Sequence, residues 1–381
     1  MGAAVYIICG GTGGHLSPGI ATAQRLRDRG GETCLVVSDR EVDNRLLQAY
    51  PELPCKRARG APFRLHPVGL VRFLFVGMFS ILEALRVLRR EKPAVLLAFG
   101  GYLSVSWALA AAWLKIPLVL HEANRVPGRS IKQLAGMADR VYFPEGIGLR
   151  RVEPKRKYSL GMPLRKEIRH IPKDLIRKKM EVPQHAKVLV IMGGSQGAQA
   201  LNDWVERHRY SLAADGIWIY LVTGPGKLEL PAREWARSDR GERVAINAFA
   251  FHDSPHQLFS CADVVISRAG AGTLAELVES LAPAILVPYP HAADNHQLYN
   301  ARYLEKRGGA VVLQQNQIDN LYREILDLIF NDWLLSRMRR NLRSLRHGDE
   351  AGKLARDLEQ VYIHKASRSG KKEARQRYEP A

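Results

Sequence analysis

The stretch VYIICGGTGGHLSPGIATAQRLRDR, residues 5–29, decides the fold. Val5 to Cys9 is an apolar, β-branched run that predicts a buried strand, a glycine-rich turn follows it, and Ile20 to Arg29 reads as a helix. Backbone N–H groups exposed by such a turn at a helix N-terminus favour a bound anion. The turn is not a dinucleotide fingerprint, because Leu16 replaces the last glycine of GxGxxG, and a purely structural turn remains the alternative.

The same strand, turn and helix unit recurs in both halves of the 381-residue chain, whose length corresponds to two domains of roughly 150 residues. We therefore predict an α/β fold of two doubly wound, Rossmann-like parallel-sheet domains that face a cleft. The N-terminal domain covers residues 1–162 and is joined by a C-terminal helix over 349–363. The second domain covers 163–348, and 364–381 form a basic, disordered tail. Residues 150–179, rich in Lys, Arg and Pro, are the predicted linker.

Ten further strands are predicted from short β-branched runs: Thr33–Val37, Val95–Phe99, Leu118–His121, Arg140–Phe143, Val188–Met192, Ile217–Thr223, Val244–Ala248, Val264–Ser267, Ala284–Val287 and Ala310–Leu313. Glycine loops follow two of those in the second half, at residues 193–197 and 268–272, and the latter opens a helix that carries Glu276. The chain thus has three glycine turns that can bind an anion, one in the first domain and two in the second. They predict a ligand in the cleft between the two domains.

Charge is distributed unevenly along the chain, whose formal net charge is +19. Residues 51–200 hold 27 basic and 10 acidic side chains, a net charge of +17, whereas residues 201–300 hold 8 and 12, a net charge of −4. This excess favours an anionic partner, and the lack of any nucleic-acid-reading pattern disfavours DNA or RNA. Four separated cysteines and a start without a signal-peptide pattern indicate a reducing cytoplasm.

Two apolar stretches bear on membrane contact. Residues 93–114 carry no charge over the length of a spanning helix, but Gly100 and Gly101 divide them into a strand and an Ala-rich helix, so no span is predicted. Residues 70–79 are apolar and lie inside the basic segment. They predict docking on an anionic membrane surface, and a core helix packed on the sheet is the alternative. The cations nearby are Arg64, Arg72, Arg86, Arg89 and Arg90.

Six motifs occur in order along the chain: GGTGGHLSPGIA from Gly10, HEANRVPG from His121, GMPLR from Gly161, GGSQGAQALN from Gly193, SRAGAGTLAEL from Ser267 and PYPHAADNHQLYNA from Pro288. From residue 5 to about 363 the chain closely resembles the bacterial peptidoglycan N-acetylglucosaminyltransferases of the GT-B glycosyltransferase class. The resemblance implies inverting transfer of N-acetylglucosamine from its UDP donor to the 4-hydroxyl of undecaprenyl-diphospho-N-acetylmuramoyl-pentapeptide. It also implies a peripheral location on the cytoplasmic face of the cell inner membrane, with cell-wall synthesis proteins as candidate partners.

By the same resemblance, His15 is the candidate catalytic base, since imidazole titrates near working pH; orienting the first loop is its alternative role. Glu122 either assists this base or pairs with a neighbouring Arg. Arg165 supplies a guanidinium for the donor, Glu276 accepts the ribose hydroxyls, and Gln297 discriminates N-acetylglucosamine from other hexoses. The remaining donor contacts are Thr12, Gly13, Gly14, Asn124, Ser195, Ala271, Gly272, Thr273, Leu274 and Ala275.

The sequence also bears on the uracil contact, on metal or cofactor sites and on competing functions. Residues 251–255 depart from the family pattern, so no uracil contact is assigned to them. No DxD-type carboxylate pair or HExxH spacing occurs near the loops, so neither a metal nor another cofactor is predicted. The competing functions are a related diacylglycerol glycosyltransferase, a nicotinamide dehydrogenase and a non-catalytic basic membrane- or RNA-binding module. The failed GxGxxG argues against the dehydrogenase.

Overall fold

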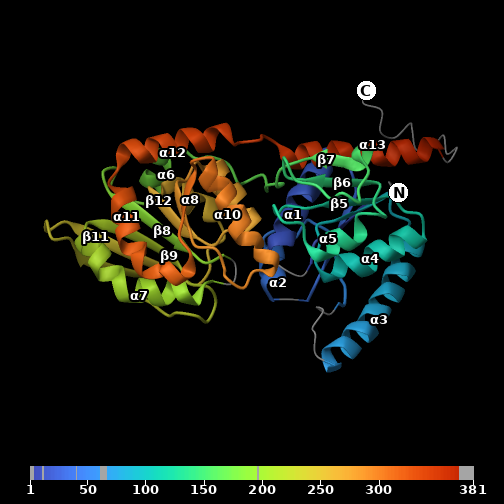
Figure 1. Cartoon of the computed structure of the whole chain (residues 1–381), viewed down its shortest axis with the longest axis horizontal. Helices are drawn as coiled ribbons and strands as arrows, with labels where there is room; N and C mark the ends of the chain where they lie inside the picture. The colour runs from blue at the N-terminus through green and yellow to red at the C-terminus, as the bar shows by residue number, and fades with distance from the viewer. Residues whose placement is uncertain (1–3, 11–12, 40, 61–66, 195–196, 369–381) are drawn as a thin grey trace. The chain divides into compact units, whose positions relative to one another are not determined.

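A computed structural model describes residues 4–10, 13–39, 41–60, 67–194 and 197–368, which form two compact units (Figure 1). Unit 1 comprises the described residues up to Lys166 and those from His347 onward, and unit 2 runs from Glu167 to Arg346. The predicted boundaries lie after residues 162 and 348. The observed boundaries lie after residues 166 and 346. The first is later than predicted because Arg165 bonds to Tyr50 and the Lys166 N–H donates to Gln24, so the chain stays on unit 1 up to that point.

The sheet of unit 1 is parallel throughout, with strand order β3-β2-β1-β4-β5-β6-β7. The order reverses between β1 and β4, which are neighbours although β2 and β3 separate them in sequence. A doubly wound sheet binds its ligands at such a reversal. The strands are β1 (Val5–Ile8), β2 (Thr33–Val37), β3 (Cys55–Arg57), β4 (Val95–Ala98), β5 (Leu118–His121), β6 (Arg140–Phe143) and β7 (Lys157–Ser159).

Helices cover both faces of this sheet, because successive residues of each strand point to opposite sides. Along β1, Val5 and Ile7 pack with α1 (Gly13–Asp28) and α13 (Glu350–Arg368). Tyr6 and Ile8 belong to the other core cluster, with residues of α3 (Pro67–Glu91), α4 (Tyr102–Trp113) and α5 (Arg129–Leu134). The remaining helices of unit 1 are α2 (Glu41–Gln48) and the 3-10 turn η1 (Pro154–Arg156).

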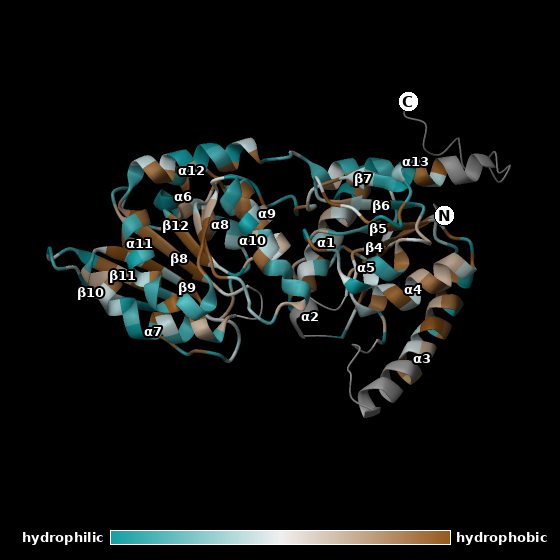
Figure 2. Ribbon diagram, in the orientation of Figure 1, coloured by the Kyte–Doolittle hydropathy of each residue, from teal (hydrophilic) through white to brown (hydrophobic). Residues whose placement is uncertain are grey.

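Unit 2 has a second seven-stranded sheet, with order β10-β11-β9-β8-β12-β13-β14. All its pairs are parallel except β10 with β11, and its order reverses between β8 and β12. The central strands are almost entirely apolar, and they appear largely brown in Figure 2, as expected of a sheet buried on both faces. The strands are β8 (Lys187–Met192), β9 (Ile217–Val222), β10 (Arg233–Arg237), β11 (Arg243–Phe249), β12 (Val264–Ser267), β13 (Ala284–Leu286) and β14 (Ala310–Val312).

One hydrophobic core, which includes Trp204, Ile266 and Leu335, joins this sheet to its helices. The helices are α6 (Lys173–Lys179), α7 (Gln199–Ala214), α8 (Pro255–Cys261), α9 (Ala271–Ser280), α10 (His296–Lys306), α11 (Leu321–Ile329) and α12 (Asp332–Ser344), with the 3-10 turns η2 (Ala293–Asn295) and η3 (Gln315–Asn320).

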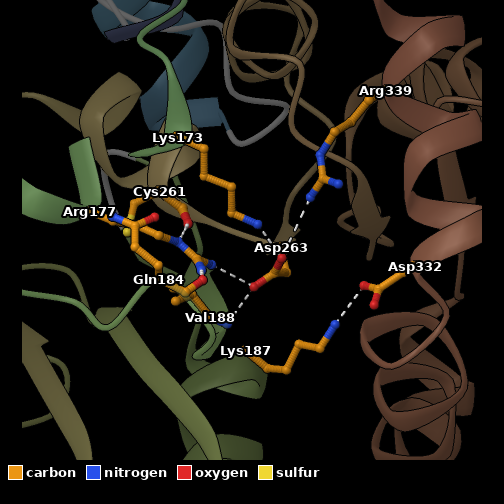
Figure 3. A network of polar contacts seen from close by, with 9 residues as sticks. All are labelled: Lys173, Arg177, Gln184, Lys187, Val188, Cys261, Asp263, Asp332 and Arg339. Atoms are coloured by element: carbon orange, nitrogen blue, oxygen red, sulfur yellow. Dashed lines mark hydrogen bonds and ion pairs between the residues drawn. The ribbon is translucent and has the colours of Figure 1, made fainter. Parts of the chain in front are cut away.

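The predicted linker over residues 150–179 contains the first boundary between the two units, at Lys166 and Glu167. It is not irregular throughout, because it also contains η1, β7 and α6. Two of its basic residues, Lys173 and Arg177, are held inside unit 2 by a buried carboxylate. Arg177 Nη2 donates to Asp263 Oδ2 at 2.7 Å, and Lys173 and Arg339 also pair with Asp263 (Figure 3). The Val188 N–H donates to the same oxygen at 2.8 Å, so the network fixes α6 and α12 against the starts of β8 and β12.

The apolar stretch over residues 70–79 lies within α3. The second half of this helix packs on α4 through Ser80, Ala84 and Leu88, which are buried. Phe75 and Phe79 remain exposed, which contradicts the alternative of a fully packed core helix for this face. At the other end of the chain, α13 extends to Arg368, beyond the predicted end at residue 363, and residues 369–381 lie outside the described residues.

Candidate functional site

Glycine turns occupy the reversal point of the unit 1 sheet, after β1 and after β4. A side chain at Gly10 would put its Cβ 2.4 Å from the Ser38 backbone nitrogen, so only glycine fits where β1 ends. Gly100 and Gly101 follow the adjacent strand β4 with φ of 97° and 81°, a backbone region that favours glycine. Both turns therefore lie at the carboxyl edge where this fold binds ligands.

His15 lies in the first turn of α1 and packs against the turn after β4. A Cβ added at Gly101 would lie 3.2 Å from His15 Nδ1, so the absence of a side chain there makes room for the imidazole. Gly13 is the first residue of α1, and Gly14 is exposed beside it. The structure thus brings His15 and these glycines together at one helix N-terminus, whereas the predicted Thr12 lies outside the described residues.

Glu122 organises the loop that follows β5, the neighbour of β4. Its Oε1 accepts hydrogen bonds from the backbone and side-chain nitrogens of Asn124 at 2.8 and 3.0 Å, and its Oε2 accepts from the Gly128 N–H at 2.6 Å. Burial raises the pKa of Glu122, and these bonds oppose that rise. In the described contacts Glu122 bonds neither to His15 nor to an Arg, so it holds Asn124 in place.

His121 ends β5 as a fully buried, neutral imidazole. Burial lowers its pKa to about 4, although the bond between Nε2 and the Gly161 carbonyl oxygen, at 2.9 Å, opposes this. The Gly161 N–H in turn donates to Glu350 Oε2 at 2.5 Å. This chain of bonds ties the loop after β5 to α13 and to the segment that leads to Arg165.

Arg165 is buried, in contrast to an ordinary solvated arginine. Its Nη1 donates to the hydroxyl of Tyr50 at 2.8 Å, and its guanidinium carbon lies 6.0 Å from the centroid of that ring. A guanidinium held in this way keeps a defined direction.

The second glycine loop follows β8 and is shaped by backbone contacts. The Gly197 N–H donates to the Gly194 carbonyl at 3.0 Å, and both residues have positive φ. A Cβ at Gly197 would lie 2.1 Å from the Thr223 carbonyl oxygen, which also accepts from Asn202 Nδ2 at 2.8 Å. The predicted Ser195 lies between these glycines but outside the described residues.

The third loop follows β12, the strand beside β8, so both loops of unit 2 meet at its reversal point. It leads directly into α9, whose first six residues are the predicted Ala271, Gly272, Thr273, Leu274, Ala275 and Glu276. The first five are partly exposed at the helix N-terminus, where free N–H groups attract anions, and Glu276 is buried in the second turn.

Gln297, in α10, is bound to the backbone of two neighbouring loops. Its Oε1 accepts from the Tyr289 N–H at 2.9 Å and from the Ala269 N–H at 3.3 Å. Two residues that sequence reasoning left without a role complete this arrangement. Asn300 Nδ2 donates to the Ala269 carbonyl at 3.2 Å, and Arg268 bonds to the loops after β13 and β14. Both lie inside the quoted motifs, which is the only sequence signal for them.

The divergent segment over residues 251–255 follows β11 and is held locally. His252 Nδ1 accepts from the Ser254 N–H at 3.2 Å, and its ring meets Phe249 edge-on with centroids 5.3 Å apart. Burial lowers the pKa of His252.

No group of three or more His, Cys, Asp or Glu side chains in the described residues could hold a metal ion. No helix in that part of the chain is both long and apolar enough to cross a membrane.

Comparison with known proteins agrees with this architecture. Residues 5–143 match the N-terminal domain of glycosyltransferase family 28, and residues 188–353 match its C-terminal domain. The structure of MurG from Acinetobacter baumannii superposes with a TM-score of 0.72 at 25% identity, covering 94% of this chain and 99% of that one. The predicted GT-B fold of two parallel-sheet domains is thereby confirmed.

Two relatives carry the name UDP-N-acetylglucosamine–N-acetylmuramyl-(pentapeptide) pyrophosphoryl-undecaprenol N-acetylglucosamine transferase. The one from Opitutus terrae is 44% identical over 93% of this chain and 94% of its own length. The one from Carboxydothermus hydrogenoformans is 34% identical over 87% and 90%. The chain therefore belongs to glycosyltransferase family 28, among these N-acetylglucosamine transferases.

Proposed function

We propose that this protein transfers N-acetylglucosamine from UDP-N-acetylglucosamine to the 4-hydroxyl of undecaprenyl-diphospho-N-acetylmuramoyl-pentapeptide, in peptidoglycan synthesis. The observation that carries the proposal is the 44% identity over 93% of the chain to a transferase named for this donor and acceptor. The glycine turns at the reversal points of both sheets support it, because a nucleotide-sugar transferase of two doubly wound units needs a ligand site on each.

Unit 2 binds the UDP moiety in this proposal. The loop with Ser195 and the N-terminus of α9, from Ala271 to Ala275, direct backbone N–H groups at the diphosphate and nucleoside. Glu276 accepts both ribose hydroxyls, since one carboxylate has two acceptor oxygens. Gln297 contacts the sugar.

Unit 1 contributes the acceptor side and the remaining donor contacts. Thr12, Gly13, Gly14 and Asn124 contact the donor, and the rigid bonds from Glu122 support a defined direction for the Asn124 amide. Arg165 contributes its guanidinium to the donor site, and the Tyr50 hydroxyl, which accepts from Nη1, fixes its orientation. Cationic and N–H groups of this kind stabilise the negative charge that develops on departing UDP.

His15 is the proposed base. It takes the proton of the acceptor hydroxyl as the oxygen attacks the anomeric carbon and the bond to UDP breaks, so one displacement inverts that carbon. The packing of its imidazole against Gly101 supports this role, because a base must be held within reach of one proton. The transfer is proposed to need no metal ion, and loss of activity after exhaustive chelation would contradict this.

The test is release of UDP by the purified protein with UDP-N-acetylglucosamine and a lipid-linked muramoyl-pentapeptide. We expect release by the native protein and by His185→Ala, an exposed histidine of unit 2, and a loss of at least a hundredfold in His15→Ala. Equal rates in the two variants would remove His15 as the base. Transfer to diacylglycerol instead of the lipid-linked acceptor would favour the related glycosyltransferase.

Membrane docking through α3 is the second part of the proposal. Phe75, Met78, Phe79 and Leu82 are 49–61% exposed on one side of the helix, and three arginines at helical spacing follow them. Leu82, Leu85, Arg86, Arg89 and Arg90 line a hollow at this end of α3. Apolar side chains beside cations bind an anionic leaflet without spanning it, which supports a peripheral position on the cytoplasmic face of the inner membrane.

Vesicle sedimentation tests the docking surface. Phe75→Ser with Phe79→Ser is expected to reduce binding to anionic vesicles at least tenfold while UDP release with a short-chain acceptor is retained. The control is Phe330→Ser with Trp333→Ser, which removes two equally exposed aromatic residues from unit 2. If the α3 variant sediments as well as the control, α3 is not the docking surface.

A further inference from the structure

Arg268 is a buried cation of unit 2 that has no task in the proposed mechanism. It directly follows β12 and is 8% exposed. Its Nη1 donates to the carbonyl oxygens of Val287 and Pro288 at 3.0 and 3.3 Å, and its Nη2 donates to Gln315 Oε1 at 2.6 Å. Burial lowers the pKa of Arg268, and within the described residues no carboxylate pairs with it. One guanidinium therefore joins the ends of three adjacent strands, β12, β13 and β14.

The backbones that Arg268 joins converge on Gln297. Ala269, which follows Arg268, and Tyr289, which follows Pro288, both direct their N–H groups at Gln297 Oε1. Only an oxygen accepts two N–H donors, so the side-chain amide cannot turn over. No described residue hydrogen-bonds to the Nε2 of Gln297, which leaves that NH2 group for a ligand.

We propose that Arg268 is a positioning residue for recognition of the donor sugar, because it holds the two backbones whose N–H groups fix the orientation of the Gln297 amide. This inference rests on the proposed function, in which Gln297 contacts the sugar. The amide then offers the sugar N–H donors and no acceptor, so it bonds to an oxygen lone pair of a ring hydroxyl. A sugar with that hydroxyl on the other side of the ring loses the bond.

Titration calorimetry with three ligands tests the proposal: UDP, UDP-N-acetylglucosamine and its 4-epimer, UDP-N-acetylgalactosamine. Selectivity is measured as the Kd for UDP-N-acetylgalactosamine divided by the Kd for UDP-N-acetylglucosamine. Arg268→Met frees the two loops, so we expect this ratio to fall about tenfold, the equivalent of one hydrogen bond. The Kd for UDP, which lacks the sugar, should change less than about threefold. Arg323→Met is the matched control, since Arg323 is exposed and pairs only with Asp327 among the described residues.

A second pair of variants separates positioning from stability. Gln315→Ala removes one partner of the guanidinium and should lower the ratio in the same direction. Gln297→Glu keeps an oxygen facing the two N–H groups but replaces the NH2 group with an acceptor, so it should also lower the ratio. An unchanged ratio in Arg268→Met, or in Gln315→Ala if Arg268→Met does not fold, overturns the proposal, as does an equal loss for all three ligands. Because these readouts are binding constants, a failure of the proposed function appears separately, as binding without transfer.

Discussion

Replacing Asp263 with Asn tests whether unit 2 depends on one buried carboxylate. Asp263 accepts hydrogen bonds from the Val188 N–H at 2.8 Å and from Arg177 Nη2 at 2.7 Å, and it also pairs with Lys173 and Arg339 (Figure 3). Asn has the same size and keeps one oxygen, but it removes the negative charge. Three cations then face one another in the interior of the unit.

The loss in the free energy of unfolding depends on which of these three cations can turn toward the solvent. Removing one partner of a buried ion pair costs roughly 3–5 kcal/mol. The side chains of Lys173 and Arg339 are 32% and 30% exposed and can turn outward, whereas Arg177 is 3% exposed and remains trapped. Arg177 still donates to the carbonyl oxygens of Gln184 and Cys261, at 2.7 and 3.3 Å. We therefore expect a loss of about 3 kcal/mol in the free energy of unfolding of unit 2, near the lower end of the range.

Urea unfolding measures this loss through the fluorescence of Trp204 and Trp218, which are buried in the core of unit 2. With an m-value of about 2–3 kcal/mol/M, the midpoint should fall by about 1–1.5 M. Asp332→Asn is the matched control, because the Asp332 carboxylate bonds to Lys187 at 2.6 Å but is 79% exposed, so its loss should cost less than about 1 kcal/mol. Equal losses in the two variants would refute the reasoning.

Three further predictions concern Lys173, Gly197 and Glu122. Burial lowers the pKa of Lys173 to about 8 in the folded protein, against an ordinary value of 10.5. Between these two pH values the unfolded chain binds more protons, so the free energy of unfolding should rise with pH. Lys173→Met should flatten this rise, measured as urea midpoints across that pH range. Gly197→Ala should lower stability by about 2–3 kcal/mol and weaken UDP binding, because its Cβ would meet a carbonyl oxygen at 2.1 Å. Gly226 has a similar positive φ, but no atom lies within 4 Å of a Cβ added there. Gly226→Ala should therefore lower stability by only about 1 kcal/mol, and equal melting temperatures for the two variants would contradict the argument. Glu122→Gln turns an NH2 group toward the Gly128 N–H, so thermal unfolding should show a loss of about 1–3 kcal/mol together with weaker donor binding; unchanged values would exclude an organising role for Glu122.

The central strands were predictable because each is an apolar, β-branched run closed by a turn. Thr33–Val37, Leu118–His121, Arg140–Phe143 and Val264–Ser267 agree with the structure residue for residue. The strands that sequence reasoning missed, β3, β7 and β10, lie at sheet edges and carry Lys or Arg. An edge strand is only partly covered, so it lacks the continuous apolar run that marks a buried one.

The candidate site follows from a set of motifs, whereas the contacts within it could not be predicted from the sequence. Gln297 follows from its motif, whereas its bonds to Ala269 and Tyr289 depend on β12 and β13 being neighbours, which is a property of the sheet order. Glu122 shows the same limit, because the expected partners were a histidine or an arginine side chain. Its actual partners are mainly backbone N–H groups, which every residue except proline carries and which therefore leave no signature in a sequence.

The basic segment shows how the structure changes the meaning of a charge count. Residues 51–200 carry a net charge of +17, which by itself suggests one extended surface for anionic partners. The structure divides them between two units, and in unit 2 Lys173 and Arg177 pair with Asp263 in the interior. Cations used in this way attract no membrane. Arg86 and Arg89, by contrast, are exposed on α3 and form no ion pair in the described part of the chain. The proposed membrane docking therefore depends on the arginines beside the exposed apolar side chains of α3, and neutralising Arg86, Arg89 and Arg90, rather than Lys173 and Arg177, should release the protein from anionic vesicles.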